Sequence, residues 1–155
     1  MSGILGTNAI TQVALVVKDI ESAKQKYASF FGIEPPPTVD SGDYKITQTT
    51  YKGEPAPKAA CKMAFFKVGD NLSLELIEPN EEPSTWRDFL NEKGEGIHHI
   101  AFGVKNMNEK LEKAAEIGIE TIQRGKYGDA SGEYAYLDAN ADLKCVIELL
   151  ESYQN

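Results

Sequence analysis

The two histidines of this sequence, His98 and His99, stand side by side in the stretch Gly94–Val104, which reads GEGIHHIAFGV. A glycine-rich turn leads there into a short apolar segment, and this pattern predicts a strand. Side chains alternate between the faces of a strand, so we expect His98 on the bulky face and His99 above the small residues Ala101 and Gly103. The bulky face suits packing on a helix. An imidazole above very small residues, as at His99, is typical of the floor of a pocket. His99 is therefore the candidate for chemistry, and His98 is assigned to the scaffold, with at most a supporting or turn role.

The sequence repeats itself internally. The repeat aligns residues 16–34 (VVKDIESAKQKYASFFGIE) with residues 103–120 (GVKNMNEKLEKAAEIGIE), with one gap, and residues 72–79 (LSLELIEP) with residues 144–151 (KCVIELLE). Each half reads as strand, helix, strand, strand, strand, and the first half carries an insertion after its helix. The sequence therefore predicts an α+β fold in which duplicated βαβββ modules form a concave mixed sheet with the helices outside.

The repeat also brings ligand-type residues into equivalent positions. Gln12 aligns with His99, and Glu75 aligns with Glu148. Each glutamate lies between aliphatic neighbours, on the strand face opposite the predicted helices. If the two halves are related by a pseudo-two-fold axis, these four side chains converge on the concave surface of the sheet.

One imidazole, two carboxylates and one amide oxygen suit a divalent ion such as Zn, Ni, Co, Mn or Fe, with coordination positions left open for water. The carboxylates would cancel the charge of the ion in a partly apolar cavity. Taken singly, a strand histidine is more often an ordinary hydrogen-bonded group, and a strand glutamate can mark the solvent face of an antiparallel sheet. The coincidence within the repeat therefore carries the prediction of one metal site, formed by Gln12, Glu75, His99 and Glu148.

The predicted organisation is a single domain over residues 1–155. Its first module is expected at 8–80, a linker helix and turn at 81–96, and the second module at 97–153.

Two local predictions concern the insertion and the second helix. Residues 43–52 (DYKITQTTYK) read as an exposed strand, followed by a loop at Gly53–Pro57. Asn106, with Glu109 three residues later, predicts a capping box at the start of the second helix.

Composition excludes several classes of function. The net charge is −8 and the pI is about 4.8, so no basic footprint for nucleic acid is present. The sequence shows no signal peptide and no apolar run long enough to span a bilayer, so we expect a cytoplasmic location and no membrane partner. Cys61 and Cys145 lie far apart in strand-like segments, where buried free thiols are the expected state.

The chain resembles the vicinal oxygen chelate superfamily, which includes glyoxalase I, methylmalonyl-CoA epimerase, extradiol dioxygenases and bleomycin-resistance proteins. The resemblance extends from Ile10 to Glu151, and GEGIHHIAF followed by a helix is especially like the epimerase branch. It implies metal ligands on the first and last strand of each module, which here fall on Gln12, Glu75, His99 and Glu148. This set looks like that of one glyoxalase I class.

The chain departs from two branches of this family. Epimerases more often carry His where this sequence has Gln12, and they use a second glutamate on the strand before that of Glu75. That position falls on or very near Lys62, which would remove one base of a two-base epimerisation. Extradiol dioxygenases use two His and one carboxylate on Fe(II), so Gln12 disfavours that branch.

The resemblance implies a metal-dependent isomerase or lyase of the glyoxalase I type. The substrate would be a small molecule with neighbouring oxygens, such as a hemithioacetal or an acyl thioester, converted through a metal-stabilised enediolate. Glu148 would move the proton with Glu75 as its counterpart, while His99 and Gln12 anchor one divalent ion. The resemblance also implies a homodimer.

Three alternatives stay open. The first is an acyl-CoA epimerase whose carrier phosphates bind the lysines of residues 45–67, although lysines that solvate edge strands explain this segment as well. The second is a metal-free binding protein of the bleomycin-resistance kind. The third is an interaction protein whose curved sheet offers an assembly surface around Trp86.

Overall fold

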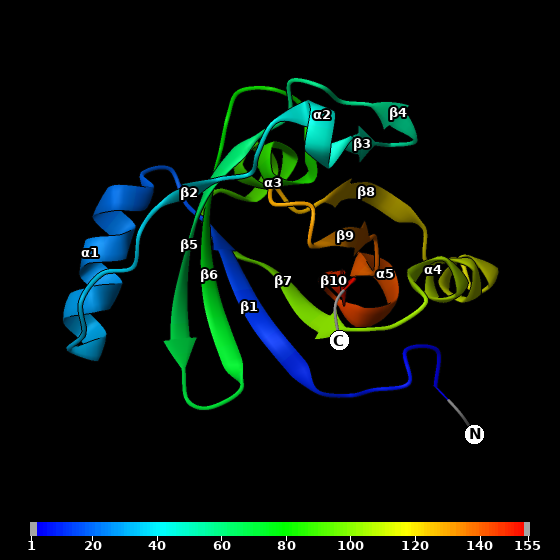
Figure 1. The fold of residues 1–155 in the computed structure, drawn as a ribbon, viewed down its shortest axis with the longest axis horizontal. Helices are drawn as coiled ribbons and strands as arrows, with labels where there is room; N and C mark the ends of the chain where they lie inside the picture. The colour runs from blue at the N-terminus through cyan, green and yellow to red at the C-terminus, as the bar shows by residue number, and fades with distance from the viewer. Residues whose placement is uncertain (1–2, 154–155) are drawn as a thin grey trace.

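The computed structural model describes residues 3–153 and contains both strands and helices (Figure 1). The strands are β1 (Ile10–Val16), β2 (Val39–Asp40), β3 (Thr50–Tyr51), β4 (Glu54–Pro55), β5 (Cys61–Val68), β6 (Leu72–Pro79), β7 (Gly96–Gly103), β8 (Thr121–Lys126), β9 (Gly132–Leu137) and β10 (Val146–Ser152). The helices are α1 (Ile20–Phe31), α2 (Tyr44–Thr47), α3 (Thr85–Lys93), α4 (Met107–Glu116) and α5 (Asn140–Leu143). None of the helices in this described part is long and apolar enough to cross a membrane.

The strands of residues 3–153 form one curved mixed sheet in the order β2-β5-β6-β1-β7-β10-β9-β8-β3-β4. β1 pairs in parallel with β6, and β7 pairs in parallel with β10, so each half has its first strand beside its last. The two halves join where β1 and β7 pair antiparallel at the centre. This arrangement confirms the predicted α+β fold with a concave mixed sheet, and the exact module boundaries stay a prediction.

Helices α1 and α4 cover the outer face of the sheet at its two flanks (Figure 1). Under α1 the core contains Leu74 and Leu76, and under α4 it contains Ile147 and Leu149. These are the neighbours of Glu75 and Glu148 along their strands. The glutamates therefore point to the concave side, as the alternation of the two strands predicts.

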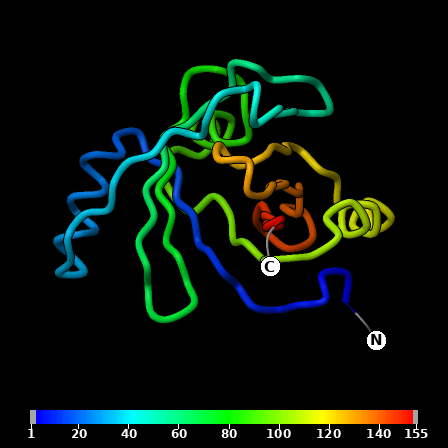
Figure 2. The backbone as a smooth tube through the Cα atoms, viewed as in Figure 1, coloured from blue at the N-terminus to red at the C-terminus, as the bar shows by residue number. Residues whose placement is uncertain are grey.

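Residues 39–51, called the closing segment below, join the two edges of the sheet. β2 lies on β5 at one edge and β3 lies on β8 at the other, so the chain between them arches over the concave side (Figure 2). The predicted exposed strand over 43–52 is wrong. Asp43 accepts a hydrogen bond from the Lys45 amide and starts the short helix α2, so that only Thr50–Tyr51 of this stretch is a strand.

The predicted loop over Gly53–Pro57 contains the short strand β4, which pairs with β3. Lys52 and Gly53 between them both have positive φ angles, the backbone geometry of a tight hairpin turn.

The closing segment contacts the turn between β8 and β9 through two glycines. A Cβ atom on Gly42 would lie 2.6 Å from Gly128 Cα, and one on Gly128 would lie 3.0 Å from the Ser41 carbonyl oxygen. Backbone therefore packs directly on backbone here, and only glycine permits this approach.

Helix α4 does not begin with the predicted capping box. Asn106 has a left-handed backbone (φ 59°), and its side chain makes no capping hydrogen bond. Instead, Glu151 on β10 accepts from the Asn106 and Met107 amides, at 3.0 and 2.8 Å. Because a left-handed residue directs its side chain away from the first turn, the amides are satisfied by a carboxylate distant in the sequence.

Candidate metal centre

Four side chains from the four central strands meet on the concave face. His99 Nε2 lies 2.9 Å from Glu148 Oε2, 3.6 Å from Glu75 Oε2 and 3.2 Å from Gln12 Oε1. All four residues are at least 92% buried, and His99 is completely so. The residues that the repeat placed at equivalent positions are thus brought together, and their role as ligands stays a prediction.

The two histidines do not lie on opposite faces of β7 as the alternation predicted. Ala14 and Leu15 of β1 pair with His99 and Ile97, so His98 is an extra residue without a partner in β1. Such a bulge turns neighbouring side chains toward the same side of a sheet. The His98 ring therefore contacts the His99 ring, with 5.1 Å between centroids, rather than packing with the bulky residues on the outer face.

Burial dominates the electrostatics of the cluster. It raises the pKa of Glu148 to about 8, and it raises the pKa of Glu75 well above 4.5, with the charge of Glu148 adding to the effect. It also lowers the pKa of His99 to about 3, so this imidazole is neutral near pH 7. A cation requires a neutral imidazole, which His99 offers, and ionised carboxylates, so its binding would displace the protons that burial favours on Glu75 and Glu148.

The donor atoms fit a divalent ion. One atom each from Glu75, His99 and Glu148 lies within 4.8 Å of the others, which makes these residues a possible three-residue metal site. Ligands about 2.1 Å from a shared ion lie roughly 3.0–3.5 Å apart at neighbouring tetrahedral or octahedral positions. The 2.9–3.6 Å separations from His99 Nε2 match that spacing.

The Gln12 amide is compatible with an ion in the cluster. With its oxygen turned inward, the amide faces only acceptor atoms, namely both carboxylates and His99 Nε2, and a cation among them would satisfy all four groups. With its nitrogen turned inward, it donates to Glu75 Oε2 and Glu148 Oε2, each at 2.9 Å. Gln12 can therefore serve the cluster with or without an ion, because an amide offers either an acceptor or a donor.

A cavity of about 520 Å³ opens onto the cluster. Its walls are largely apolar and aromatic, with Met63 and Phe65 from β5, Trp86 from α3, and Tyr134 and Tyr136 from β9. Three residues with hydroxyl side chains, Ser41, Thr47 and Thr49, line the cavity from the closing segment. An apolar chamber with a few polar groups is typical of a small-molecule site.

Lys62 is not part of this cavity. It lies 3.9 Å from Glu78, whose other oxygen accepts from the first amide of α1. The neighbouring cavity residue on β5 is Met63, and Phe65 follows it on the same face. The place expected for a second glutamate is therefore occupied by apolar side chains.

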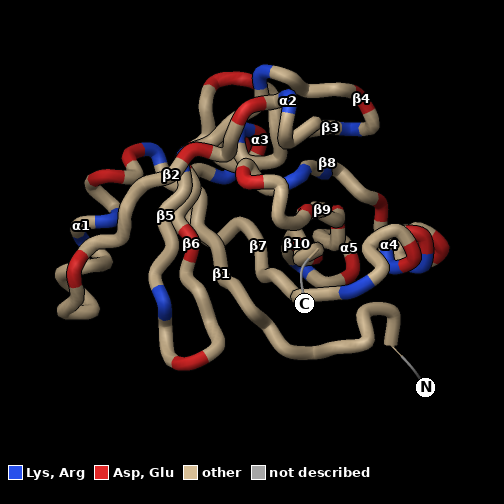
Figure 3. The backbone as a smooth tube through the Cα atoms, in the orientation of Figure 1, with Lys and Arg blue, Asp and Glu red and all other residues tan. Residues whose placement is uncertain are grey.

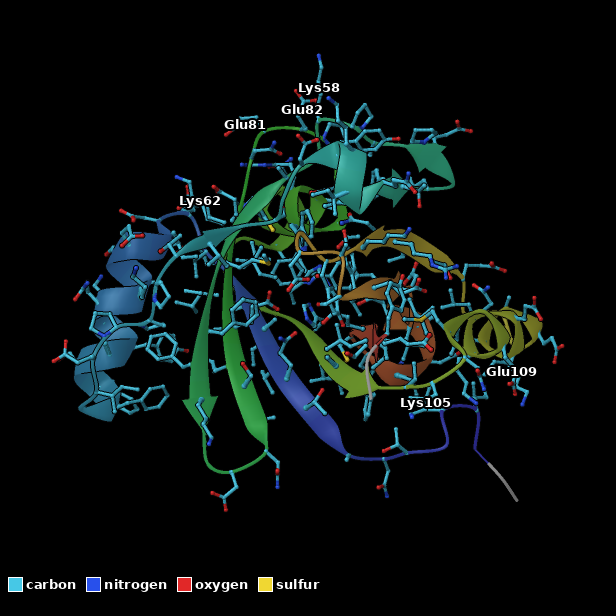
Figure 4. The ribbon with its side chains drawn as sticks, viewed as in Figure 1. Lys58, Lys62, Glu81, Glu82, Lys105 and Glu109 are labelled. Carbon is cyan, nitrogen blue, oxygen red and sulfur yellow. The ribbon has the colours of Figure 1, made fainter. Side chains whose placement is uncertain are left out.

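The lysines of residues 45–67, which one alternative assigned to carrier phosphates, do not form one cluster. Lys52 lies over the ring of Tyr51 and Lys62 pairs with Glu78. Basic residues are spread over well-separated elements (Figure 3), and Lys58 and Lys62 stand apart (Figure 4). In the described part of the chain, the one lysine among the cavity residues is Lys126.

Sequence reasoning missed the aromatic support of the cluster. Tyr136 pairs directly with Glu148 in the sheet, hydrogen-bonds to its carboxylate and stacks near His99, with 5.0 Å between ring centroids. Trp86 Nε1 donates to the Tyr136 hydroxyl at 2.9 Å. The alternation of Tyr134 and Tyr136 with Ala135 and Leu137 was the signal that could have found them.

Trp86 is 3% exposed. The prediction of an assembly surface around it is therefore wrong, because its ring packs inside the concave core with Tyr136.

Both cysteines are free thiols, as expected. Cys61 is buried and Cys145 is partly buried.

Comparison with known proteins gives a consistent result. The family model described as Glyoxalase/Bleomycin resistance protein/Dioxygenase superfamily matches residues 11–136. An uncharacterized protein of Bacillus subtilis, YqjC, is 26% identical over 145 residues, which cover 93% of this chain and 92% of that protein. The ethylmalonyl-CoA/methylmalonyl-CoA epimerase of Cereibacter sphaeroides is 25% identical over 143 residues, with 90% and 95% covered.

Solved structures show the same fold. Methylmalonyl-CoA epimerase from Mycobacterium tuberculosis has a TM-score of 0.67 at 18% identity and covers 98% of this chain and 91% of its own. A variant of the Streptomyces coelicolor enzyme, in complex with 2-nitronate-propionyl-CoA, has a TM-score of 0.66 at 21% identity, with 94% and 98% covered.

Proposed function

Because the chain belongs to the Glyoxalase/Bleomycin resistance protein/Dioxygenase superfamily, also called the vicinal oxygen chelate superfamily, we propose that it is a metal-dependent isomerase or lyase. The reaction would transfer a proton at the carbon next to a carbonyl group, as in the glyoxalase I type. The observation that carries the proposal is the buried convergence of Glu75, His99 and Glu148 at the end of an apolar cavity.

The residues that would hold the ion are Gln12, Glu75, His99 and Glu148, and Zn, Ni, Co and Mn all suit this donor set. When bound, the ion supplies a Lewis acid that stabilises negative charge on a substrate oxygen. The chain has three oxygen donors and one nitrogen donor here and no thiolate, because Cys61 lies in the concave core without contributing to the cluster.

The proton is moved by Glu148. Its carboxylate lies at the cavity surface, and its position is set by Tyr136, which pairs with it in the sheet and hydrogen-bonds to it. A carboxylate held in this way takes the proton from the carbon and returns it to a neighbouring atom of the substrate. Glu75 holds the equivalent position in the first half of the sheet and is the second carboxylate of the cluster.

The closing segment excludes water from the reacting atoms. Thr47 and Thr49 are about 95% buried although they line the cavity, and the Thr49 hydroxyl donates to Thr47 Oγ1 at 3.1 Å. Exclusion of water protects a carbanion-like species from unwanted protonation and strengthens the electrostatic effect of the cluster.

A second candidate is epimerisation of an acyl-CoA thioester. The relative from Cereibacter sphaeroides, named an ethylmalonyl-CoA/methylmalonyl-CoA epimerase, favours it because the similarity extends over nearly the whole of both chains. The apolar pair Met63 and Phe65, at the place of a second acidic group, disfavours a two-base mechanism. We therefore rank transfer by a single base first.

The decisive experiment measures metal content and turnover of the same preparation. Protein purified without chelator is expected to contain one equivalent of a transition metal and to convert a 2-oxoaldehyde hemithioacetal. Turnover of a 2-methylacyl-CoA thioester instead would select the epimerase. Absence of metal after reconstitution, with tight binding of an unreacted ligand, would select the metal-free binding protein.

Glu148→Gln is expected to abolish turnover while the fold is kept, because the amide has nearly the shape of the carboxylate but cannot accept the proton. Glu112→Gln, at an exposed position of α4, is the matched control and should retain full activity. A fully active Glu148→Gln protein would rule out the assignment of the base. A homodimer and a cytoplasmic location stay predictions.

A further inference from the structure

The two histidines contact each other through their Nδ1 atoms. His98 Nδ1 lies 2.8 Å from His99 Nδ1, and both rings are at least 98% buried. The remaining nitrogens point in opposite directions, with His98 Nε2 3.0 Å from Thr85 Oγ1 and His99 Nε2 2.9 Å from Glu148 Oε2. The rings therefore form a continuous polar path from α3 to the candidate metal centre.

This contact couples the hydrogen positions of the two rings. A neutral imidazole carries one hydrogen, on one of its two nitrogens. A hydrogen bond between the Nδ1 atoms holds one hydrogen, because two would repel and none would leave lone pairs facing each other. A hydrogen on His99 Nδ1 thus requires the hydrogen of His98 on Nε2, where Thr85 can accept it.

We propose that His98 is a positioning residue, which accepts the Nδ1 hydrogen of His99 and thereby directs the free lone pair of His99 Nε2 toward the metal ion. The inference rests on the proposed function in taking His99 as a ligand. It extends that function to a residue that touches neither ion nor substrate. Hydrogen-bond partners of this kind fix the tautomer and the ring orientation of a metal-binding histidine.

Packing holds His98 in place independently of these hydrogen bonds. The bulge in β7 turns it toward His99, and the rings of Phe89 and Tyr136 meet its ring edge-on at centroid distances of 5.3 and 5.4 Å. Thr85, the first residue of α3, is itself fixed because its amide donates to Gln123 Oε1 at 2.9 Å. The acceptor atom offered to His99 is therefore preorganised.

The unaltered protein provides the first test, by long-range ¹H–¹⁵N correlation spectra of the zinc-loaded form. We expect His99 to carry its hydrogen on Nδ1 with Nε2 bound to zinc, and His98 to carry its hydrogen on Nε2. A His98 hydrogen on Nδ1 in the loaded protein would overturn the inference alone. Absence of any change at His99 Nε2 when zinc is added would overturn both the ligand assignment and the inference.

Two matched variants provide the second test. His98→Asn places an amide oxygen close to the position of Nδ1 and keeps the acceptor, whereas His98→Gln places its amide near the position of Nε2 and loses it. We expect His98→Gln to weaken zinc binding about 10- to 100-fold, as is usual for loss of such a partner, and His98→Asn to retain most of the affinity.

Competition with a chromogenic chelator measures both dissociation constants, and the melting temperatures without metal report the structural cost of each change. Equal losses of affinity in the two variants, or none in either, would contradict the inference. If neither variant folds, the spectra of the unaltered protein decide.

Discussion

Glu75 and Glu148 place two acidic side chains where water is almost excluded, each 4% exposed. Burial disfavours the charged form of both, and the charge of Glu148 further disfavours that of Glu75. Such an arrangement weakens the ion-free fold, and the proposed cation would offset this cost by compensating the charge of the same two residues.

The pH dependence of stability follows from these carboxyl groups. Their pKa values are higher in the folded state than the 4.5 of the unfolded chain, and that of Glu148 is about 8. The folded protein therefore binds more protons between these values, so the free energy of unfolding falls as the pH rises through this window. Urea titrations in the presence of a chelator should show this fall and a plateau above it.

Glu75→Gln removes one of the two interacting charges. We expect this variant to lose a large part of the pH dependence without metal and to bind zinc more weakly. Saturating zinc should abolish the fall in the unaltered protein, because the ion compensates both charges. A stability that stays level across this pH range without metal would contradict the proposed burial of the charges.

At the scale of elements, helix α4 begins at a carboxylate supplied by another strand. Glu151→Ala should lower the free energy of unfolding by about 1–2 kcal/mol, since two amides at the positive end of the helix lose their acceptor. Asn106→Gly, at a left-handed residue without a capping bond, should change it by no more than about 0.5 kcal/mol. Urea unfolding of both variants measures the two free energies of unfolding. A larger loss in Asn106→Gly than in Glu151→Ala would show that Asn106 caps the helix.

The closing segment depends on the glycine contact with the β8–β9 turn. Gly42→Ala would bring a methyl group 2.6 Å from Gly128 Cα, whereas Gly53→Ala meets nothing within 4 Å. Both positions have positive φ, 108° at Gly42 and 81° at Gly53, so both substitutions carry a backbone penalty, and Gly42→Ala adds the steric clash. We expect Gly42→Ala to destabilise the protein by about 1–3 kcal/mol more than Gly53→Ala. Equal losses of stability in chemical denaturation would show that the closing segment can move away from the β8–β9 turn with little loss of free energy.

At the scale of the molecule, the two halves share one concave core. Ala14 and Ile77 from the first half, Trp86 from the connecting helix, and Tyr136 and Val146 from the second half belong to a single apolar cluster. Neither half can bury this surface without the other. The site therefore forms only when the whole sheet forms.

Unfolding should consequently be a single transition. Trp86 is the one tryptophan of the chain and lies in the shared core, so its fluorescence measures whether the two halves are still packed together. Its urea midpoint is expected to coincide with that of the far-ultraviolet circular dichroism signal. An earlier fluorescence midpoint would mean that the halves separate before they unfold.

Much of the fold and of the candidate site can be predicted from the sequence. Periodicity and the internal repeat predict the strands, the outer helices and the four residues of the cluster, because alternation and duplication are local properties of a sequence. The apolar runs and the turn signal predict strands at Ala9–Val17, Cys61–Val68 and Leu72–Glu78, and the bounds of β1, β5 and β6 lie within one residue of these. The wrong predictions of local structure concern 43–52, Asn106 and the separation of His98 from His99.

Each wrong prediction has a tertiary cause. The closing segment follows the two sheet edges that it must connect, Glu151 reaches the start of α4 from a distant strand, and pairing with β1 creates the bulge that brings the histidines together. The sequence by itself determined that Gln12, Glu75, His99 and Glu148 face the concave side, since for these residues the alternation along single strands holds. The tertiary structure alone decided that His98 touches His99 and that Tyr136 holds Glu148, because register and bulges arise only when strands pair.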